Sequence, residues 1–195
     1  MDPAFLNRQF LLKRQVLALT GIFRIYNPSG GLLFYSRQKM FRLKEDISVF
    51  SDEASTRPVL RISARQVIDF SAAYDVVDVT TGEQVGAIQR QGWRSLARDE
   101  WHFFSPLGGA PLAILQEDSL GRALLRRYLL HTLLPLDYHL ASPTGGAIGS
   151  FHQRFNPLRF VLELNLEGND GQLDPRLAIA ALVLLAAVEG RQFRD

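Results

Sequence analysis

The sequence predicts one soluble domain in which many antiparallel strands wrap a hydrophobic C-terminal helix. Three observations predict this mainly β fold class. Residues 10–104 form a succession of short alternating or β-branched segments that are separated by turn residues. Residues 177–188 are apolar on every side, so a helix there must be enclosed. A chain of 195 residues with 47% hydrophobic content is also long enough to bury one substantial core.

Hairpins account for the first half of the chain. Residues 21–27 alternate in polarity, which places Arg24 and Tyr26 on one face of a strand. Residues 28–31, Pro-Ser-Gly-Gly, supply the positive-φ turn that a hairpin requires, and residues 32–39 return as the partner strand. Strand-length segments of the same kind follow at 47–50, 59–64, 74–79, 85–91, 101–104 and 111–116.

The period of the apolar residues changes between residues 118 and 131. Leucines there recur at helical spacing and arginines lie between them, which predicts an amphipathic surface helix. Strands return at 137–141, 147–153 and 160–166, so the predicted number of strands approaches twelve.

The last helix has the clearest boundaries. Asp174 is a good N-cap, Pro175 suits the first helical position, and Gly190 can end the helix. Twelve residues at about 1.5 Å each span roughly 18 Å, which matches the bore length of a small barrel. We predict one domain over residues 7–195, preceded by a short tail at residues 1–6 whose order the sequence leaves open.

Composition excludes several classes of function. The formal charge of +2 provides no strong field for a nucleic acid, although 19 of the 22 basic residues are arginine, which favours bidentate contacts with anions. The chain contains no cysteine, so disulfides and thiolate zinc sites are excluded and a cytoplasmic setting is expected. Arg8 and Lys13 argue against a signal peptide. The longest apolar run is too short for the roughly 18 to 20 residues of a membrane span, so an integral membrane protein is not expected.

Four segments, in their order along the chain, carry a resemblance to a known family. They are NPSGGLLFYSRQKMF at 27–41, LKEDISVFS at 43–51, WRSLARDEW at 93–101 and LDPRLAIAALVLLAAVEGRQF at 173–193. With these segments the chain resembles the LURP-one-related family of the Tubby C-terminal-like superfamily, which phospholipid scramblases share. The resemblance implies a closed barrel of about twelve antiparallel strands around a central helix.

The resemblance also implies a class of function. Tubby domains bind phosphoinositide head groups at a basic surface, scramblases are linked to calcium and lipid movement, and many LURP-one-related proteins have no assigned activity. We therefore predict a non-enzymatic domain that binds anionic phospholipid or another phosphate-bearing ligand at an arginine-rich surface, peripheral to a membrane. The alternatives are a protein-interaction or scaffold module that uses an exposed hairpin edge or loop, and an enzyme with a pocket at the barrel mouth.

Two groups of arginines are candidates for binding an anion, because a guanidinium group matches the geometry of a phosphate. Arg122, Arg126 and Arg127 lie in the predicted surface helix, where the alternative is a solvated helix face. Arg94 and Arg98 lie close to Asp99, so they could form an anion pocket or an internal ion-pair network.

Calcium is the cofactor to consider, since the loop EGNDGQLD at 167–174 precedes the last helix much as an acidic loop does in scramblases. Asp170 and Asp174 are the candidate ligands. The loop lacks the alternate oxygen ligands and the late glutamate of an EF-hand, so a plain turn capped by Asp174 is the alternative.

No catalytic motif is visible in the sequence. The histidines lack metal-binding spacing, the serines lack a nucleophile elbow, and residues 145–149 lack the lysine and helix of a phosphate-binding loop. The 13 phenylalanines and two tryptophans are better explained as filling of the core than as a platform for nucleic-acid bases. Neither an enzyme nor a nucleic-acid partner is expected.

Overall fold

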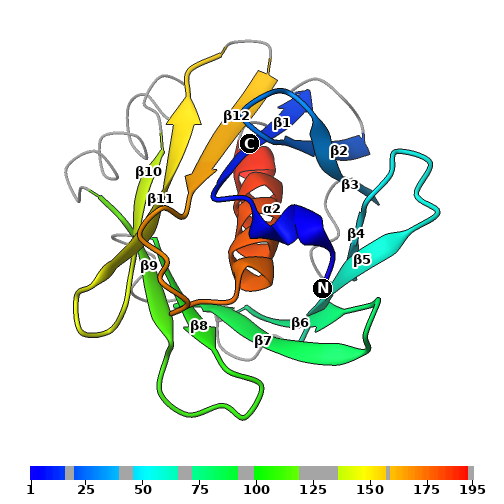
Figure 1. Cartoon of the computed structure of the whole chain (residues 1–195). Helices are drawn as coiled ribbons and strands as arrows, with labels where there is room; N and C mark the ends of the chain where they lie inside the picture. Colours follow the sequence, from blue (N-terminus) through cyan, green and yellow to red (C-terminus); the bar gives the residue numbers. More distant parts are fainter. Residues whose placement is uncertain are drawn as a thin grey trace.

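The described residues form twelve strands and a long helix inside them (Figure 1). The structure is a computed structural model that describes residues 1–15, 20–39, 46–65, 72–91, 99–118, 136–156 and 159–192. The strands are β1 (Gln9–Gln15), β2 (Thr20–Tyr26), β3 (Leu32–Lys39), β4 (Ile47–Phe50), β5 (Pro58–Ala64), β6 (Ala73–Asp78), β7 (Glu83–Arg90), β8 (Glu100–Phe104), β9 (Ala113–Glu117), β10 (Asp137–Ala141), β11 (Ala147–Arg154) and β12 (Arg159–Asn165). The helices are the 3-10 turn η1 (Pro3–Leu6) and α2 (Pro175–Gln192).

The strands close into a single antiparallel barrel. Each strand pairs with its neighbours in the sequence, and β1 pairs with β12 to complete the circle. The predicted mainly β fold, a closed barrel around a C-terminal helix, is confirmed.

Helix α2 fills the bore of the barrel. Every residue from Leu177 to Ala186 is at most 2% exposed. The surrounding strands supply the other half of this core from alternate positions, such as Phe10 and Leu12 of β1. The absence of a polar stripe on the helix therefore has the predicted cause, which is enclosure by sheet on all sides.

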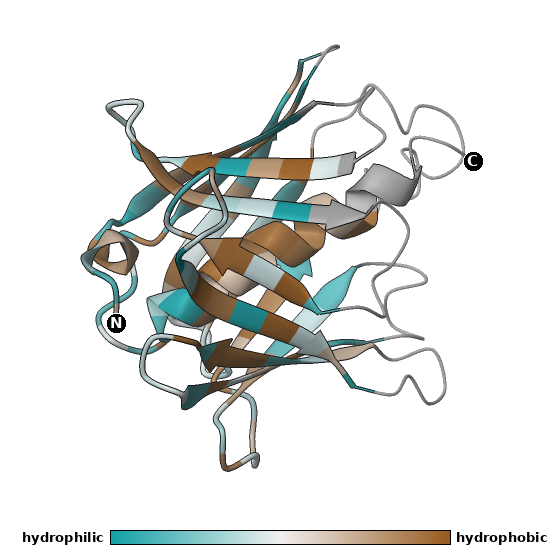
Figure 2. Ribbon diagram, turned by 90° about the vertical axis from the view of Figure 1, so that its right-hand side faces the viewer, coloured by the Kyte–Doolittle hydropathy of each residue, from teal (hydrophilic) through white to brown (hydrophobic). Residues whose placement is uncertain are grey.

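The two ends of the barrel differ in what they carry. Helix α2 enters at the end that holds η1, the segment 166–174 and the turns 27–31, 51–57, 79–82, 105–112 and 142–146 (Figure 2). We call this the helix-entry end. The opposite end, where β1, β3, β5, β7, β9 and β11 finish, is the helix-exit end.

Part of the predicted N-terminal tail belongs to the core. Phe5 of η1 is 1% exposed and stacks on Phe34, with ring centroids 4.5 Å apart. The backbone N–H of Ala4 donates to the Asp2 side chain at 2.9 Å and thereby caps the turn. Ala4 and Phe5 are thus packed against the core, whereas Leu6 is 66% exposed.

Strand β1 was not delimited by the sequence pattern. Its inward positions are Phe10, Leu12 and a buried arginine, Arg14, while Leu11 faces outward. An inward charge and an outward leucine obscure the alternation that marks the other strands. Strand β9 also begins two residues later than expected, because Pro111 belongs to the turn before it. Apart from Asp118, the predicted surface helix at 118–131 lies outside the described residues.

Candidate functional site

The arginines predicted from the sequence lie outside the described residues. This applies to Arg94, Arg98, Arg122, Arg126 and Arg127. The described strands that precede and follow them, β7 to β10, have their adjoining ends at the helix-exit end. An anion site at these five arginines therefore stays a prediction.

Asp99, which the sequence placed beside Arg98, is the centre of an internal network. Its carboxylate accepts hydrogen bonds from Arg90 Nε at 2.8 Å, Trp101 Nε1 at 2.9 Å and Tyr138 Oη at 3.0 Å. The residue is only 6% exposed. Three internal donors satisfy this buried carboxylate. Arg94 and Arg98, the partners predicted from the sequence, lie outside the described residues, so the choice between an anion pocket and a network at those two arginines stays a prediction.

The calcium candidates lie in the segment that leads into α2. Asp170 is exposed, whereas the Asp174 carboxylate accepts the backbone N–H of Arg176 at 2.9 Å and the Arg176 Nη2 at 2.7 Å. Asp174 thus caps the helix, as the alternative interpretation required. Within the described ranges, no three histidine or acidic side chains gather into a group that could hold a metal ion.

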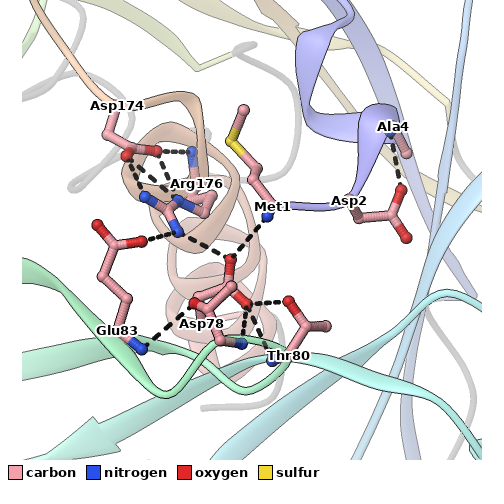
Figure 3. A network of polar contacts seen from close by, with 9 residues as sticks. Met1, Asp2, Ala4, Asp78, Thr80, Glu83, Asp174 and Arg176 are labelled. Atoms are coloured by element: carbon pink, nitrogen blue, oxygen red, sulfur yellow. Dashed lines mark hydrogen bonds and ion pairs between the residues drawn. The ribbon is translucent and has the colours of Figure 1, made fainter.

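Arg176 joins the start of α2 to the β6–β7 hairpin (Figure 3). Its Nη1 donates to Asp78 Oδ2 at 2.8 Å and to Glu83 Oε2 at 2.7 Å. Both Arg176 and Asp78 are buried, with side chains 6% and 1% exposed. Burial by itself would raise the pKa of Asp78, but hydrogen bonds from Thr80 and Arg176 outweigh burial and hold this pKa below its usual range. This cluster fixes the helix in the barrel.

A second group of charges faces solvent on the outside of the barrel. Five basic side chains occupy outward positions on five of the six successive strands from β12 through β1 to β5, each next to buried inward residues. We call this group the basic wall. Its members are Lys13 of β1, Arg24 of β2, Arg37 of β3, Arg61 of β5 and Arg159 of β12.

Like charges meet directly across two strands of the basic wall. Lys13 lies opposite Arg24 in the β1–β2 register, and Arg24 lies opposite Tyr35 in the β2–β3 register, so Arg37 is a diagonal neighbour of Arg24. Like charges in opposite positions repel each other. A bound anion between them would remove that repulsion, which makes this arrangement suited to a phosphate group.

Aromatic rings support two of these cations. Lys13 Nζ lies 4.8 Å from the centroid of Tyr26, and Arg24 Cζ lies 5.8 Å from that of Tyr35. Arg24 Nε also donates to Glu53 Oε1 at 2.6 Å, and this hydrogen bond raises the pKa of Arg24. For the other four members, the described part of the chain supplies no carboxylate partner within ion-pair distance.

A shallow pocket adjoins the basic wall. It has a volume of about 360 Å³ and lies over β1, β11 and β12. Its lining includes Leu11, Pro28 and the exposed ion pair between Arg154 and Glu163. Arg154 and Lys13 both lie beside Val161 in their registers, so the pocket continues the row of the wall that contains Lys13.

The sequence pattern placed one member of the basic wall, Arg24, on a strand face, but it did not predict that the five cations form a group. Alternation placed Arg24 and Tyr26 on the same strand face, as observed. The same phasing applied to residues 9–15 and 32–39 would place Lys13 and Arg37 outward. No local signal, however, says that these strands are neighbours or fixes their register.

Comparisons with known proteins agree with the fold. The model of the LURP-one-related family matches residues 32–185, which is most of the chain. An X-ray structure of a protein from Arabidopsis thaliana is similar with a TM-score of 0.54 and 14% sequence identity, and the alignment covers 96% of each chain. At this identity the similarity shows the fold alone. A comparison with curated protein sequences returned no significant match.

The family match and the architecture point to the same conclusion. Neither α2 nor η1, the described helices, combines the length and apolar character that a membrane span needs. The matched segment extends from β3 into α2 and so contains most of the closed barrel and the greater part of its central helix. The chain belongs to the LURP-one-related family.

Proposed function

We propose that this chain is a non-catalytic domain that binds phosphate-bearing anions, and that its ligand is the anionic surface of a membrane. The observation that carries the proposal is the basic wall of five outward cations. Among the described residues, Arg24 has a carboxylate partner, Glu53, and the other four members have none. Arginine forms paired hydrogen bonds with phosphate oxygens, and each basic residue near an anionic membrane contributes about 1 kcal/mol of binding free energy.

The two ends of the barrel differ in charge, and this difference supports the basic wall and the helix-exit end, rather than the helix-entry end, as the binding surface. The segments at the helix-entry end, together with the residues that flank η1, carry more acidic than basic residues. The two basic residues are Arg8 and Arg57. The six acidic residues are Asp2, Asp52, Glu53, Glu167, Asp170 and Asp174. An anionic surface is repelled from that end. The five arginines predicted from the sequence fall between strands whose adjoining ends are at the opposite end, and we include them in the proposal as further contacts.

Flotation of the full chain with vesicles tests the proposal. Arg37→Glu should weaken binding to vesicles of phosphatidylcholine and phosphatidylserine by at least about fivefold, since about 1 kcal/mol is lost for each basic residue that no longer contributes. The matched control is Arg57→Glu, because Arg57 is also exposed and lies at the helix-entry end. Its binding should equal that of the unchanged chain.

Three results would contradict the proposal. The unchanged chain fails to bind anionic vesicles, it binds pure phosphatidylcholine equally well, or both charge reversals weaken binding to the same extent. Thermal unfolding of each variant establishes that the barrel is intact, and exposed charge reversals of this kind are expected to change stability by less than about 0.5 kcal/mol.

One observation favours a protein-interaction module as the second candidate. Each described strand pairs on both sides, so the barrel offers no free strand edge to a partner protein. The contact to test is therefore an exposed loop. The turn 105–112 has no charged residue, and its Leu107 is 98% exposed. A partner protein that binds the unchanged chain and Arg37→Glu, but not Leu107→Ser, would favour this candidate.

A further inference from the structure

We infer that Phe155 is a membrane anchor that enters the apolar part of a bilayer while the arginines beside it hold lipid phosphates. The inference rests on the proposed function and narrows it, because a soluble phosphate compound offers nothing to an exposed aromatic ring. According to this inference, the phosphate groups that the basic wall binds are the head groups of a lipid bilayer.

Phe155 lies at the beginning of the connection from β11 to β12, and its side chain is largely exposed. Phe155 follows β11 directly and is 62% exposed. The next residue, Asn156, accepts the backbone N–H of Arg159 on its Oδ1 at 2.9 Å, which ties this connection to the start of β12. The ring is therefore exposed to solvent directly after β11, at the helix-exit end.

Arginines flank this ring on both strands. Arg154, the last residue of β11, has a side chain 62% exposed and pairs with Glu163, and Arg159 is the first residue of β12 and a member of the basic wall. Arg154 lies opposite Val161, which in turn lies opposite Lys13. Phe155 thus stands at the edge of the basic wall and next to one of its rows.

An aromatic ring between arginines is suited to the interface of a bilayer. The ring gains free energy by leaving water, and the guanidinium groups reach the phosphates at the level where the ring enters. Surface-bound membrane proteins combine basic residues with exposed phenylalanine, leucine or tryptophan in this way. Each component is weak alone, and the two together give a stable contact.

Exposure of an apolar side chain is not sufficient for this role. Leu107 is 98% exposed, which is more than Phe155, but it lies at the helix-entry end, where the flanking segments are acidic overall. Single exposed apolar residues are common on soluble proteins. What distinguishes Phe155 is its place beside the basic wall, and Leu107 is therefore the natural control.

Tryptophan placed at each position reports insertion. Full-length Phe155→Trp and Leu107→Trp are mixed with phosphatidylcholine and phosphatidylserine vesicles whose acyl chains are brominated. Bromine quenches a tryptophan that enters the acyl region. Relative to the unchanged chain with its two tryptophans, Phe155→Trp should show additional quenching and a blue shift, and Leu107→Trp should show neither.

Binding measurements separate the anchor from the basic wall. Phe155→Ala should weaken binding to anionic vesicles by about tenfold, as expected for an aromatic ring that no longer leaves water. It should not change the binding of a soluble inositol phosphate, which Arg37→Glu should weaken. Both positions are exposed, so thermal unfolding should be the same for all variants.

The outcomes distinguish this inference from the function on which it rests. If Phe155→Ala binds vesicles as well as the unchanged chain while Arg37→Glu does not, the anchor is refuted and the basic wall stands. Equal added quenching in Phe155→Trp and Leu107→Trp, or added quenching in neither variant, also refutes the anchor. If the unchanged chain does not bind anionic vesicles, both proposals fail together.

Discussion

The buried carboxylate of Asp78 needs a cation, and Arg176 supplies it. The two residues are 98 positions apart in the sequence, yet their side chains meet at 2.8 Å with little exposure to solvent. Asp174 and Glu83 complete the shell around the guanidinium group, and the hydrogen bond to Asp174 is the main cause that raises the pKa of Arg176. The charges are thus buried as a set that is satisfied only when α2 is in place.

Removal of Arg176 should therefore be costly. We expect Arg176→Leu to lower the free energy of unfolding by about 3 to 5 kcal/mol, because the buried Asp78 carboxylate loses the cation that hydrogen-bonds it and keeps only the Met1 amino group at 4.0 Å. Urea denaturation measures the change. Arg57→Leu removes an exposed arginine and should cost less than about 0.5 kcal/mol. Equal effects of the two substitutions would show that the ion pair does not stabilise the fold.

Acid should weaken the same cluster. The pKa of Asp78 is lower in the folded chain than in the unfolded one, where it is about 3.9, so its contribution to stability is complete above that pH. The contribution is lost as the pH falls below about 4 towards the folded pKa. Asp78→Asn should be less stable than the unchanged chain at pH 7, and its stability should decline less steeply below pH 4. If the free energy of unfolding of Asp78→Asn and that of the unchanged chain fell equally steeply with pH, this account would be contradicted.

At the scale of the element, α2 is determined by its composition. Ten consecutive side chains, Leu177 to Ala186, contact only the interior of the barrel. Asp174 and Pro175 set its first turn, since one caps the helix and the other needs no hydrogen-bond acceptor there. Within this run of ten residues, no position can take a charge without burying it.

A charge in the middle of α2 should be severely destabilising. Leu182 is 0% exposed, and Leu182→Asp should lower the free energy of unfolding by several kcal/mol because the new carboxylate has no partner. Leu107→Asp introduces the same group at a position 98% exposed and should be close to neutral. Thermal unfolding compares the two. A Leu182→Asp chain as stable as the unchanged one would be inconsistent with an enclosed helix.

At the scale of the whole molecule, closure of the barrel separates the residues that stabilise the fold, which lie inside, from the residues that can bind a ligand, which lie outside. The bore is occupied by α2, and the described strands have no unpaired edge, so charges outside the barrel are free to serve a ligand. Acidic residues predominate at the helix-entry end and the basic wall lies on the outer face of β12 and β1 to β5. This distribution is compatible with a net charge of only +2.

Binding through the wall should depend on salt while the fold should not. The screening length falls from about 10 Å at 0.1 M salt to about 3 Å at 1 M. Anionic vesicles should therefore release most of the chain over that range, whereas its thermal unfolding temperature should change little because the core is apolar. Salt-independent vesicle binding would exclude the basic wall as the contact surface.

Single positions show how far sequence patterns extend. Most strands, the turn at 28–31 and the cap at Asp174 follow from alternation and turn chemistry, which are local properties. The sequence pattern does not delimit strand β1, because Arg14 faces inward, where a charge is not expected. The predicted network of Asp99 with Arg94 and Arg98 stays a prediction, and no sequence pattern indicated that Trp101 of β8 and Tyr138 of β10 both donate to Asp99.

The sequence by itself determined most strand segments and the enclosed helix, because polarity at period two and a run of apolar residues are properties of neighbouring positions. The family followed from the resemblance of four segments in their order along the chain. Tertiary structure alone decided which outward residues form the basic wall and which carboxylate receives Arg176. The physical reason is that Lys13, Arg24 and Arg37 become neighbours only through strand register, and Asp78 meets Arg176 only when the closed barrel admits α2.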